Sequence, residues 1–321
     1  MNSMDTFRRL LQTPLPTERL NWSVAESAGV EVFVRRLDQV DGAISGNKAW
    51  KLQYHLEKAL QLAHPQLLTF GGAWSNHLHA TAAAGNLLGL PTIGVVRATA
   101  EEINHCPTPT LVDCQRWGMK IVPVSREEYR EKHLDFFKDW LRREFDNPWI
   151  VPEGAGDALG VMGAQGIITP GDRSGRWSSV VVSAGTGATA AGLLISLQGT
   201  CPLFVVNALK GADMRSMVKQ KLRETLLDEN FAEELLQNAF FWNEAHAGGF
   251  GKKSAELEAF EETWNFEVVL PLDRVYTLKT MFALGQMLVL PPVKRPECLQ
   301  PGNRVLFIHT GGLQGNRTLP G

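Results

Sequence analysis

Cysteine, net charge and long apolar runs are all scarce in this sequence, and each shortage excludes a class of protein. The 321 residues include only 4 Cys, in no C-x-x-C pair, so we expect neither a zinc site nor a disulfide framework. A formal net charge of -2 gives no electrostatic basis for binding nucleic acid. No apolar run approaches a membrane span, and Pro14, Pro16 and Glu18 interrupt any signal core in residues 1–20. The sequence therefore predicts a cytoplasmic protein without membrane or nucleic-acid partners.

Apolar material is sufficient for sizeable cores, since 44% of the residues are hydrophobic and 21% are charged. Short β-branched runs alternate with helical stretches, which is typical of parallel sheets covered by helices in the α/β class. Strands are predicted at residues 31–36, 67–70, 92–97, 120–124, 149–151, 178–183, 203–206, 267–270 and 305–308. Helices are predicted at residues 47–61, 75–88, 110–117, 126–145, 213–236 and 276–288, and from the turn at 185–189 to residue 195.

The composition changes near Lys48 and again near Gly154. These changes predict two domains, a large one from residues 1–48 and 152–321 and a small one from residues 49–151 inserted between them.

Two lysines open the helix predicted after Gly46. Lys48 and Lys51 are three residues apart, so both ammonium groups lie on one helix face. Neighbouring cations lower each other's pKa, and the neutral amine is the form that attacks a carbonyl. A lone lysine is usually a solvated surface charge, but a phosphate bound by Lys51 would explain why this pair is tolerated.

A glycine- and threonine-rich turn follows the predicted strand 178–183. In residues 183–189, SAGTGAT, small side chains allow backbone N–H groups to converge on an anion at a helix start. The turn lacks the lysine of a P-loop and the third glycine of a dinucleotide fingerprint. It predicts either a phosphate cradle or a tight turn without a ligand.

Residues 71–77, GGAWSNH, also connect a strand to a helix. Ser75 and Asn76 would lie at the helix N-terminus, where a carboxylate or phenolate oxygen can be bound. The alternative is an ordinary helix cap. Pyridoxal phosphate (PLP) requires three things from a protein. They are an amine, hydroxyl and amide groups at a helix start, and a cradle for the phosphate.

With these motifs the chain resembles the fold-type-II PLP enzymes, in the family of D-cysteine desulfhydrase and 1-aminocyclopropane-1-carboxylate (ACC) deaminase. The resemblance implies two open twisted parallel-sheet domains of the tryptophan synthase β type. It also implies a homodimer that acts on a small amino-acid substrate. The similarity runs from Gly46 to Gly312 and rests on residues 46–52 (GNKAWKL), 71–77 (GGAWSNH), 185–192 (GTGATAAG), 275–279 (VYTLK) and 308–312 (IHTGG).

The resemblance also implies residue roles. Lys48 would form the Schiff base and carry the proton, with Ser75 and Tyr276 as further catalytic residues. Asn76 would bind the ring hydroxyl, Ser75 the substrate carboxylate, and Tyr276 would stack on the ring. The expected cofactor-binding residues are Lys48, Lys51, Asn76, Thr186, Gly187, Ala188, Thr189, Tyr276, Thr277 and Thr310, and the expected substrate-binding residues are Trp74, Ser75, His77 and Phe250.

Thr277 and Thr310 favour one branch of the family. The deaminase branch carries glutamate and leucine at these positions, whereas the desulfhydrase branch carries small hydroxyl residues. A hydroxyl beside the pyridine nitrogen makes the ring a weaker electron sink than a carboxylate does. That sink suffices for β-elimination, so we expect a D-cysteine desulfhydrase that forms pyruvate, hydrogen sulfide and ammonia.

The substrate side departs from the family pattern. Trp74 replaces a glutamine, Trp50 and His79 replace arginines, and Phe250 replaces a tyrosine. Three alternatives therefore stay open: ACC deamination or elimination from another β-substituted amino acid, a non-catalytic PLP-binding protein, and a small-molecule binding module without cofactor.

Overall fold

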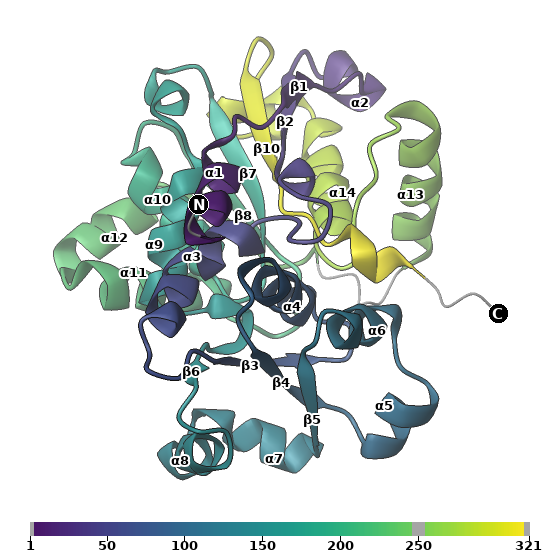
Figure 1. Cartoon of the computed structure of the whole chain (residues 1–321). Coiled ribbons are helices and arrows are strands. Elements are labelled where there is room, and N and C mark those ends of the chain that lie inside the picture. Colours follow the sequence, from purple (N-terminus) through teal and green to yellow (C-terminus); the bar gives the residue numbers. More distant parts are fainter. Residues whose placement is uncertain (1–2, 246–253, 318–321) are drawn as a thin grey trace.

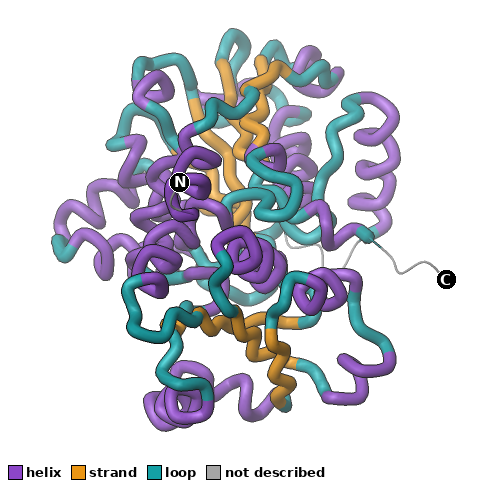
Figure 2. Tube along the Cα trace, viewed as in Figure 1, coloured by secondary structure: helices purple, strands orange, loops and turns teal. Residues whose placement is uncertain are grey.

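The computed structural model describes residues 3–245 and 254–317 of the chain. Two separate sheets organise it, with helices around both, as the orange strands and purple helices of Figure 2 show. In Figure 1 the smaller sheet lies below the larger one. The expectation of two parallel-sheet units in the α/β class is confirmed.

The large sheet has six strands in the order β1-β2-β10-β7-β8-β9. Only β1 at its edge is antiparallel to its neighbour, and the other pairs are parallel. Its strands come from both ends of the chain: β1 (Thr17–Arg19), β2 (Glu31–Arg36), β7 (Ser179–Ala184), β8 (Leu203–Asn207), β9 (Ala239–Trp242) and β10 (Arg304–His309).

The small sheet is parallel, in the order β5-β4-β3-β6. Its strands are consecutive in the chain: β3 (Leu67–Gly72), β4 (Thr92–Arg97), β5 (Lys120–Val124) and β6 (Trp149–Ile150). They all fall within the segment predicted as the small domain, whose exact limits stay a prediction.

Helices cover both faces of each sheet because alternate strand residues point to opposite faces. Val180 and Val182 pack into one apolar cluster with helices α1, α3, α9, α10, α11 and α12, whereas Val181 packs into a second cluster with α2, α13 and α14. The helices are α1 (Ser3–Gln12), α2 (Ser23–Ser27), α3 (Lys48–Leu60), α4 (Asn76–Leu88), α5 (Ala100–His105), α6 (Pro109–Arg116), α7 (Arg126–Arg130), α8 (Asp135–Glu144), α9 (Ala158–Ala164), α10 (Ala188–Leu197), α11 (Met214–Leu226), α12 (Glu229–Gln237), α13 (Ala255–Glu267) and α14 (Thr277–Leu288).

The single helix predicted at residues 126–145 is wrong. The chain forms α7 and α8, and Leu134 between them is extended, with φ -78° and ψ 141°. Tyr129 and Phe137 both pack into the apolar cluster under the small sheet. Residues eight apart on a continuous helix point about 80° apart, so the break allows both rings to reach that cluster.

Two further predictions near the C-terminal half are wrong. The helix predicted at 213–236 is divided into α11 and α12, because Leu227 adopts φ 55° and Asp228 caps the second helix by accepting a hydrogen bond from Phe231 N. The strand predicted at 267–270 does not form. Glu267 ends α13 and Val269 has φ 55°, a left-handed conformation that interrupts an extended chain.

Candidate active site

Lys48 opens helix α3, and a close backbone contact fixes where that helix starts. Gly46 has φ 83°, and a Cβ at this position would clash with the carbonyl oxygen of Thr310. Asn47 N donates to the same carbonyl at 3.2 Å. Only glycine permits this approach, which places the first turn of α3 against the carboxyl end of β10.

The Lys48 amine is held within the structure rather than in open solvent. Its Nζ donates to Asn47 Oδ1 at 3.0 Å, and the side chain is half-buried. Burial of the ammonium lowers the pKa of Lys48 to about 8, although the Asp273 carboxylate acts in the opposite direction. A substantial fraction of this amine is therefore neutral near physiological pH.

Lys51 lies one turn further along α3 and is only 2% exposed. Its Nζ donates to Thr186 Oγ1 at 3.3 Å. Within residues 3–245 and 254–317, no carboxylate lies within 4 Å of this ammonium. Burial, and then the charge of Lys48, holds the pKa of Lys51 well below its usual value. A buried ammonium on a hydroxyl-bearing turn has the chemistry of an anion site.

The turn from β7 to α10 faces these lysines. Gly187, with φ 79°, caps α10, so Thr186, Ala188 and Thr189 are grouped at the helix N-terminus. Asn47 Nδ2 donates to Thr189 Oγ1 at 2.8 Å, which ties this turn to the start of α3. Backbone amides and the helix dipole favour a negative group here.

Tyr276 lies directly before α14 and contacts the same turn. A Cβ at Gly185 would lie 3.2 Å from Tyr276 Cε1, so glycine allows the ring to lie close to the backbone. Burial, and then the charge of Asp273, raises the pKa of the Tyr276 phenol above its usual range. The phenol is therefore neutral across the physiological pH range.

Helix α4 contacts α3 and carries the GGAWSNH motif at its start. Ser75 is its N-cap, and its hydroxyl accepts from Leu78 N at 3.3 Å. Asn76 Oδ1 accepts from Gln314 Nε2 at 2.6 Å, and Asn76 Nδ2 would lie 2.5 Å from a Cβ at Gly312. Ser75 therefore caps α4, while Asn76 lies beside the segment that follows β10. A role in capping the helix does not exclude a role in binding a ligand at the same turn.

Other predicted substrate residues are less uniformly placed. Trp74 is 44% exposed, whereas His77 is buried and its Nε2 shares a 2.8 Å hydrogen bond with Thr69 Oγ1 of β3. Burial, and then the charges of Lys48 and Lys51, lowers the pKa of His77, so its ring is neutral. Phe250 lies outside the described residues.

Thr277 and Thr310 do not form a pair. The Thr310 hydroxyl shares a 2.9 Å hydrogen bond with Ser183 Oγ of β7. The Thr277 hydroxyl is fully buried and donates to Asp273 Oδ1 at 3.1 Å. Their predicted place beside a pyridine nitrogen stays a prediction.

Sequence reasoning missed Asp273. Its carboxylate is 2% exposed and accepts from the backbone amides of Val275, Tyr276 and Thr277 at 3.0, 3.2 and 2.8 Å. Burial raises its pKa, while these hydrogen bonds act in the opposite direction. An aspartate placed just before a helix is a capping signal, and this signal could have identified it.

The residues fit PLP. The Lys48 amine would bind the aldehyde, and the buried Lys51 ammonium on the same helix turn would bind the phosphate. The small-residue turn at Gly185 would leave room for the edge of the ring. Across the part of the chain that the structure describes, no group of three or more His, Cys, Asp or Glu could hold a metal ion. No helix there is both long and apolar enough to cross a membrane.

The chain is similar in sequence to several proteins of one kind. No protein-family model matches the chain. D-cysteine desulfhydrases of Salmonella typhi and Salmonella paratyphi A are 29% identical over 316 residues, which cover 94% of this chain and 93% of each relative.

Solved structures share the fold. An ACC deaminase homologue has a TM-score of 0.76 and 25% identity, covering 97% of this chain and 95% of its own. A fungal L-serine ammonia-lyase from Rhizomucor miehei has a TM-score of 0.62 at 16% identity, covering 93% of both chains, and this more distant likeness concerns the fold alone. The chain is thus similar over nearly its whole length to D-cysteine desulfhydrases, and it has the fold of the fold-type-II PLP enzymes.

Proposed function

We propose that the protein is a PLP-dependent lyase that removes the β-substituent of a small amino acid, with D-cysteine as the first substrate to test. The observation that carries the proposal is the position of Lys48 and Lys51. Their amines lie on one helix turn, and Lys51 donates to Thr186 at the start of α10. The relatives named D-cysteine desulfhydrase support the substrate class.

The chain's own groups would divide the work. Lys48 Nζ would bind the cofactor aldehyde and, once displaced by the substrate amine, take the Cα proton, for which a pKa of about 8 is well suited. Lys51, Thr186 and Thr189 would hold the phosphate. When bound, PLP supplies an electron sink for the charge that develops at Cα.

Ser75 at the start of α4 would hold the substrate carboxylate, and the Tyr276 ring would keep the cofactor plane in place. The overall reaction consumes one water for each D-cysteine and gives pyruvate, hydrogen sulfide and ammonia. The Cβ–S bond breaks with its electron pair on sulfur, and no external oxidant is needed.

ACC deamination is the second candidate. The Asp273 carboxylate accepts from the Thr277 hydroxyl, so a carboxylate does lie near the position where the deaminase branch carries glutamate. Ammonia and a keto acid released from ACC, with none from D-cysteine, would favour this alternative. A yellow protein inactive on both would favour a PLP-binding protein without catalysis.

We also propose a cytoplasmic homodimer. Cys106, Cys114, Cys201 and Cys298 are all free thiols, which supports a reducing compartment. The dimer rests on the family resemblance, and sedimentation equilibrium of the purified protein tests it.

Replacing Lys48 with alanine tests the lyase proposal. We expect Lys48→Ala to lose keto-acid release from D-cysteine by about 10²–10⁴-fold or more, because the proton-carrying amine is removed. The matched control is Lys58→Ala, which removes an exposed lysine of the same helix and should keep full activity. Equal activity of Lys48→Ala and Lys58→Ala would refute the assignment.

A further inference from the structure

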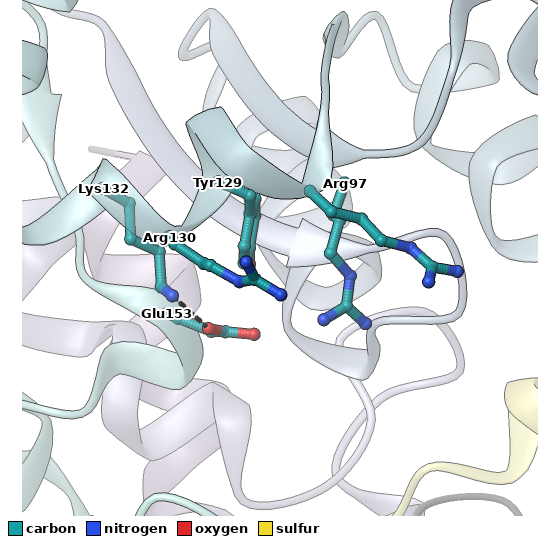
Figure 3. Close-up of a pocket in the computed structure, with 6 residues that line it drawn as sticks. Arg97, Tyr129, Arg130, Lys132 and Glu153 are labelled. Atoms are coloured by element: carbon teal, nitrogen blue, oxygen red, sulfur yellow. Dashed lines mark ion pairs between the residues drawn. The ribbon is translucent and has the colours of Figure 1, made fainter.

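A basic cavity of about 470 Å³ lies at the edge of the small sheet. Six residues line it, drawn as sticks in Figure 3: Arg97, Arg126, Tyr129, Arg130, Lys132 and Glu153. Its volume lies in the usual range for a small-molecule site.

Positive charge dominates this cavity. Lys132 pairs with Glu153, with 3.5 Å between Nζ and Oε2. Among the residues that the structure describes, no carboxylate lies within 4 Å of the guanidinium groups of Arg97, Arg126 or Arg130. These three cations are exposed at the cavity. Unpaired arginines converging on one space are suited to a carboxylate, phosphate or sulfonate.

The Tyr129 ring contacts two of the cations, those of Lys132 and Arg97. The Lys132 ammonium lies 4.5 Å and the Arg97 guanidinium 5.6 Å from the centroid of its ring. The ring is buried, and Figure 3 shows it between the side chains of Lys132 and Arg97. The basic wall is therefore partly preorganised.

The cavity adjoins the candidate active site. Arg97 ends β4, Arg126 opens the helix after β5, and Glu153 follows β6, so these residues share the carboxyl edge of the sheet. Arg97 is paired in register with Gly72 of the GGAWSNH turn, and its Nη2 would lie 3.6 Å from a Cβ there. Gly154, next to Glu153, would place a Cβ 2.9 Å from Thr186 Cγ2 in the turn from β7 to α10.

We propose that this cavity binds the negatively charged end of the substrate side chain, so the substrate is an amino acid whose β-substituent is an oxyanion that can leave, such as a phosphate ester or a sulfonate. This inference rests on the proposed lyase function and names its substrate class. The α-carboxylate of the substrate would remain at Ser75, while its second anionic group occupies the basic cavity. Electrostatic attraction would also concentrate such substrates at the site.

The chemistry balances for a phosphate ester. In O-phosphoserine the Cα proton leaves to a base and the Cβ–O bond breaks, with its electron pair departing on phosphate. One water then completes the conversion to pyruvate and ammonia, and no redox partner is required.

The test measures keto-acid release by the PLP-loaded enzyme from both enantiomers of O-phosphoserine and of cysteine. We expect kcat/KM for O-phosphoserine to exceed that for cysteine. Arg130→Gln and Arg97→Gln should each lower the O-phosphoserine-to-cysteine ratio at least tenfold, mainly through KM. Adding salt should lower the same ratio in the unmodified enzyme.

Arg143→Gln is the matched control. Arg143 is an exposed arginine of α8, whose C-terminal end borders the opposite, amino edge of the small sheet. This variant should keep the ratio of the unmodified enzyme. A ratio unchanged by both Arg130→Gln and Arg97→Gln would overturn the inference, while cysteine turnover would leave the lyase proposal standing.

Calorimetry separates failure of the lyase proposal from failure of the cavity. If no amino acid releases a keto acid, O-phosphoserine and inorganic phosphate are titrated into the same proteins. The anion subsite alone would be supported if O-phosphoserine binds, if Arg130→Gln weakens this binding tenfold, and if Arg143→Gln leaves it unchanged. Absence of binding, or equal binding by both variants, would contradict it.

Discussion

At the residue scale, the ionisation of Lys48 controls when its amine can react. Burial lowers the pKa of this side chain to about 8, whereas an unperturbed lysine titrates near pH 10.4. The folded protein therefore holds the proton less tightly than the unfolded chain does. The neutral, nucleophilic form accumulates as the pH rises through about 8 rather than two units higher.

This shift predicts the pH dependence of cofactor binding. Between pH 7 and pH 9 the neutral fraction of an amine with a pKa near 8 rises from about a tenth to about nine-tenths. The rate at which apoprotein gains visible absorbance after PLP is added should rise in proportion. Stopped-flow measurement of Lys58→Ala should give the same profile, and a rate that is flat across this range would contradict the pKa of Lys48.

A second residue-scale prediction concerns Lys51. Removing its charge in Lys51→Met should weaken PLP binding about 10–100-fold, because a hydrogen bond to a charged group is worth about 1.5–3 kcal/mol. A spectral titration measures this affinity. Pyridoxal, which lacks the phosphate, serves as the comparison ligand and should bind both proteins equally. A similar loss for pyridoxal would show that Lys51 does not act through the phosphate.

Several of these residue positions were predictable from sequence because they depend on local spacing. The two lysines on one helix face and the small residues of the 185–189 turn are visible in the order of residues alone. The partners of Asn47, Asn76 and Thr310 come from distant segments and required the fold. The basic cavity was missed for the same reason, since the residues that line it lie at the ends of three different strands.

At the element scale, the start of α14 depends on one buried carboxylate. Asp273 satisfies amides that the helix leaves without intrahelical partners, and it also acts on the pKa of Lys48. The same side chain therefore connects the stability of this helix with the ionisation of the candidate catalytic amine.

Replacing Asp273 with asparagine should have two effects. The free energy of unfolding should fall by about 1–3 kcal/mol, because charge-assisted bonds to buried amides are weakened. The pKa of Lys48 should fall further, since the carboxylate that raises it is removed. Urea unfolding and the pH profile of PLP binding report these effects separately.

The control for this variant is Asp213→Asn. Asp213 caps α11 at an exposed site, where asparagine caps a helix about as well as aspartate. This variant should change neither the free energy of unfolding nor the pH profile of PLP binding. An unchanged pH midpoint in Asp273→Asn would contradict the electrostatic contact with Lys48.

Many elements were predictable from apolar periodicity, whereas two helix breaks, the strand expected at 267–270 and several short elements such as β1, β9 and α5 were not predicted correctly. β2, β4 and β5 have the predicted limits, because each is a short β-branched run between turn signals. Helix breaks at Leu134 and Leu227 carry no glycine or proline and follow from tertiary packing. Sequence periodicity alone therefore joined helices that the structure separates.

At the scale of the whole molecule, a buried ion pair joins β2 to a distant segment. Arg35 donates two hydrogen bonds to Asp172, at 2.6 and 2.8 Å, and Trp177 Nε1 donates to the same carboxylate at 2.8 Å. Burial alone would raise the pKa of Asp172, but these bonds hold it well below its usual value. The pair thus joins β2 of the large sheet to a segment that is far from it in the chain.

Asp172→Asn should destabilise the protein by about 3–5 kcal/mol, because Arg35 is left as a buried charge without its partner. Since the folded pKa of Asp172 is depressed, its contribution is complete above the unfolded pKa of about 3.9 and is lost as the pH falls below it. Urea unfolding between pH 3 and pH 7 measures both quantities.

The comparison variant is Asp139→Asn, which breaks the exposed pair with Arg142. Its cost should stay within about 0.5 kcal/mol at every pH, as expected for a surface ion pair. Equal losses in the two variants would contradict a special role for the buried pair.

The contact between Gly46 and the end of β10 has a consequence for protein synthesis. The carbonyl of Thr310 and the backbone of Gly311 press against Gly46, so the lysine two residues later is positioned by a segment that is synthesised long after it. A nascent chain that already exposes Lys48 does not yet have the surface that orients it. If Lys48 binds PLP as proposed, chains that stop before residue 310 should therefore lack that binding.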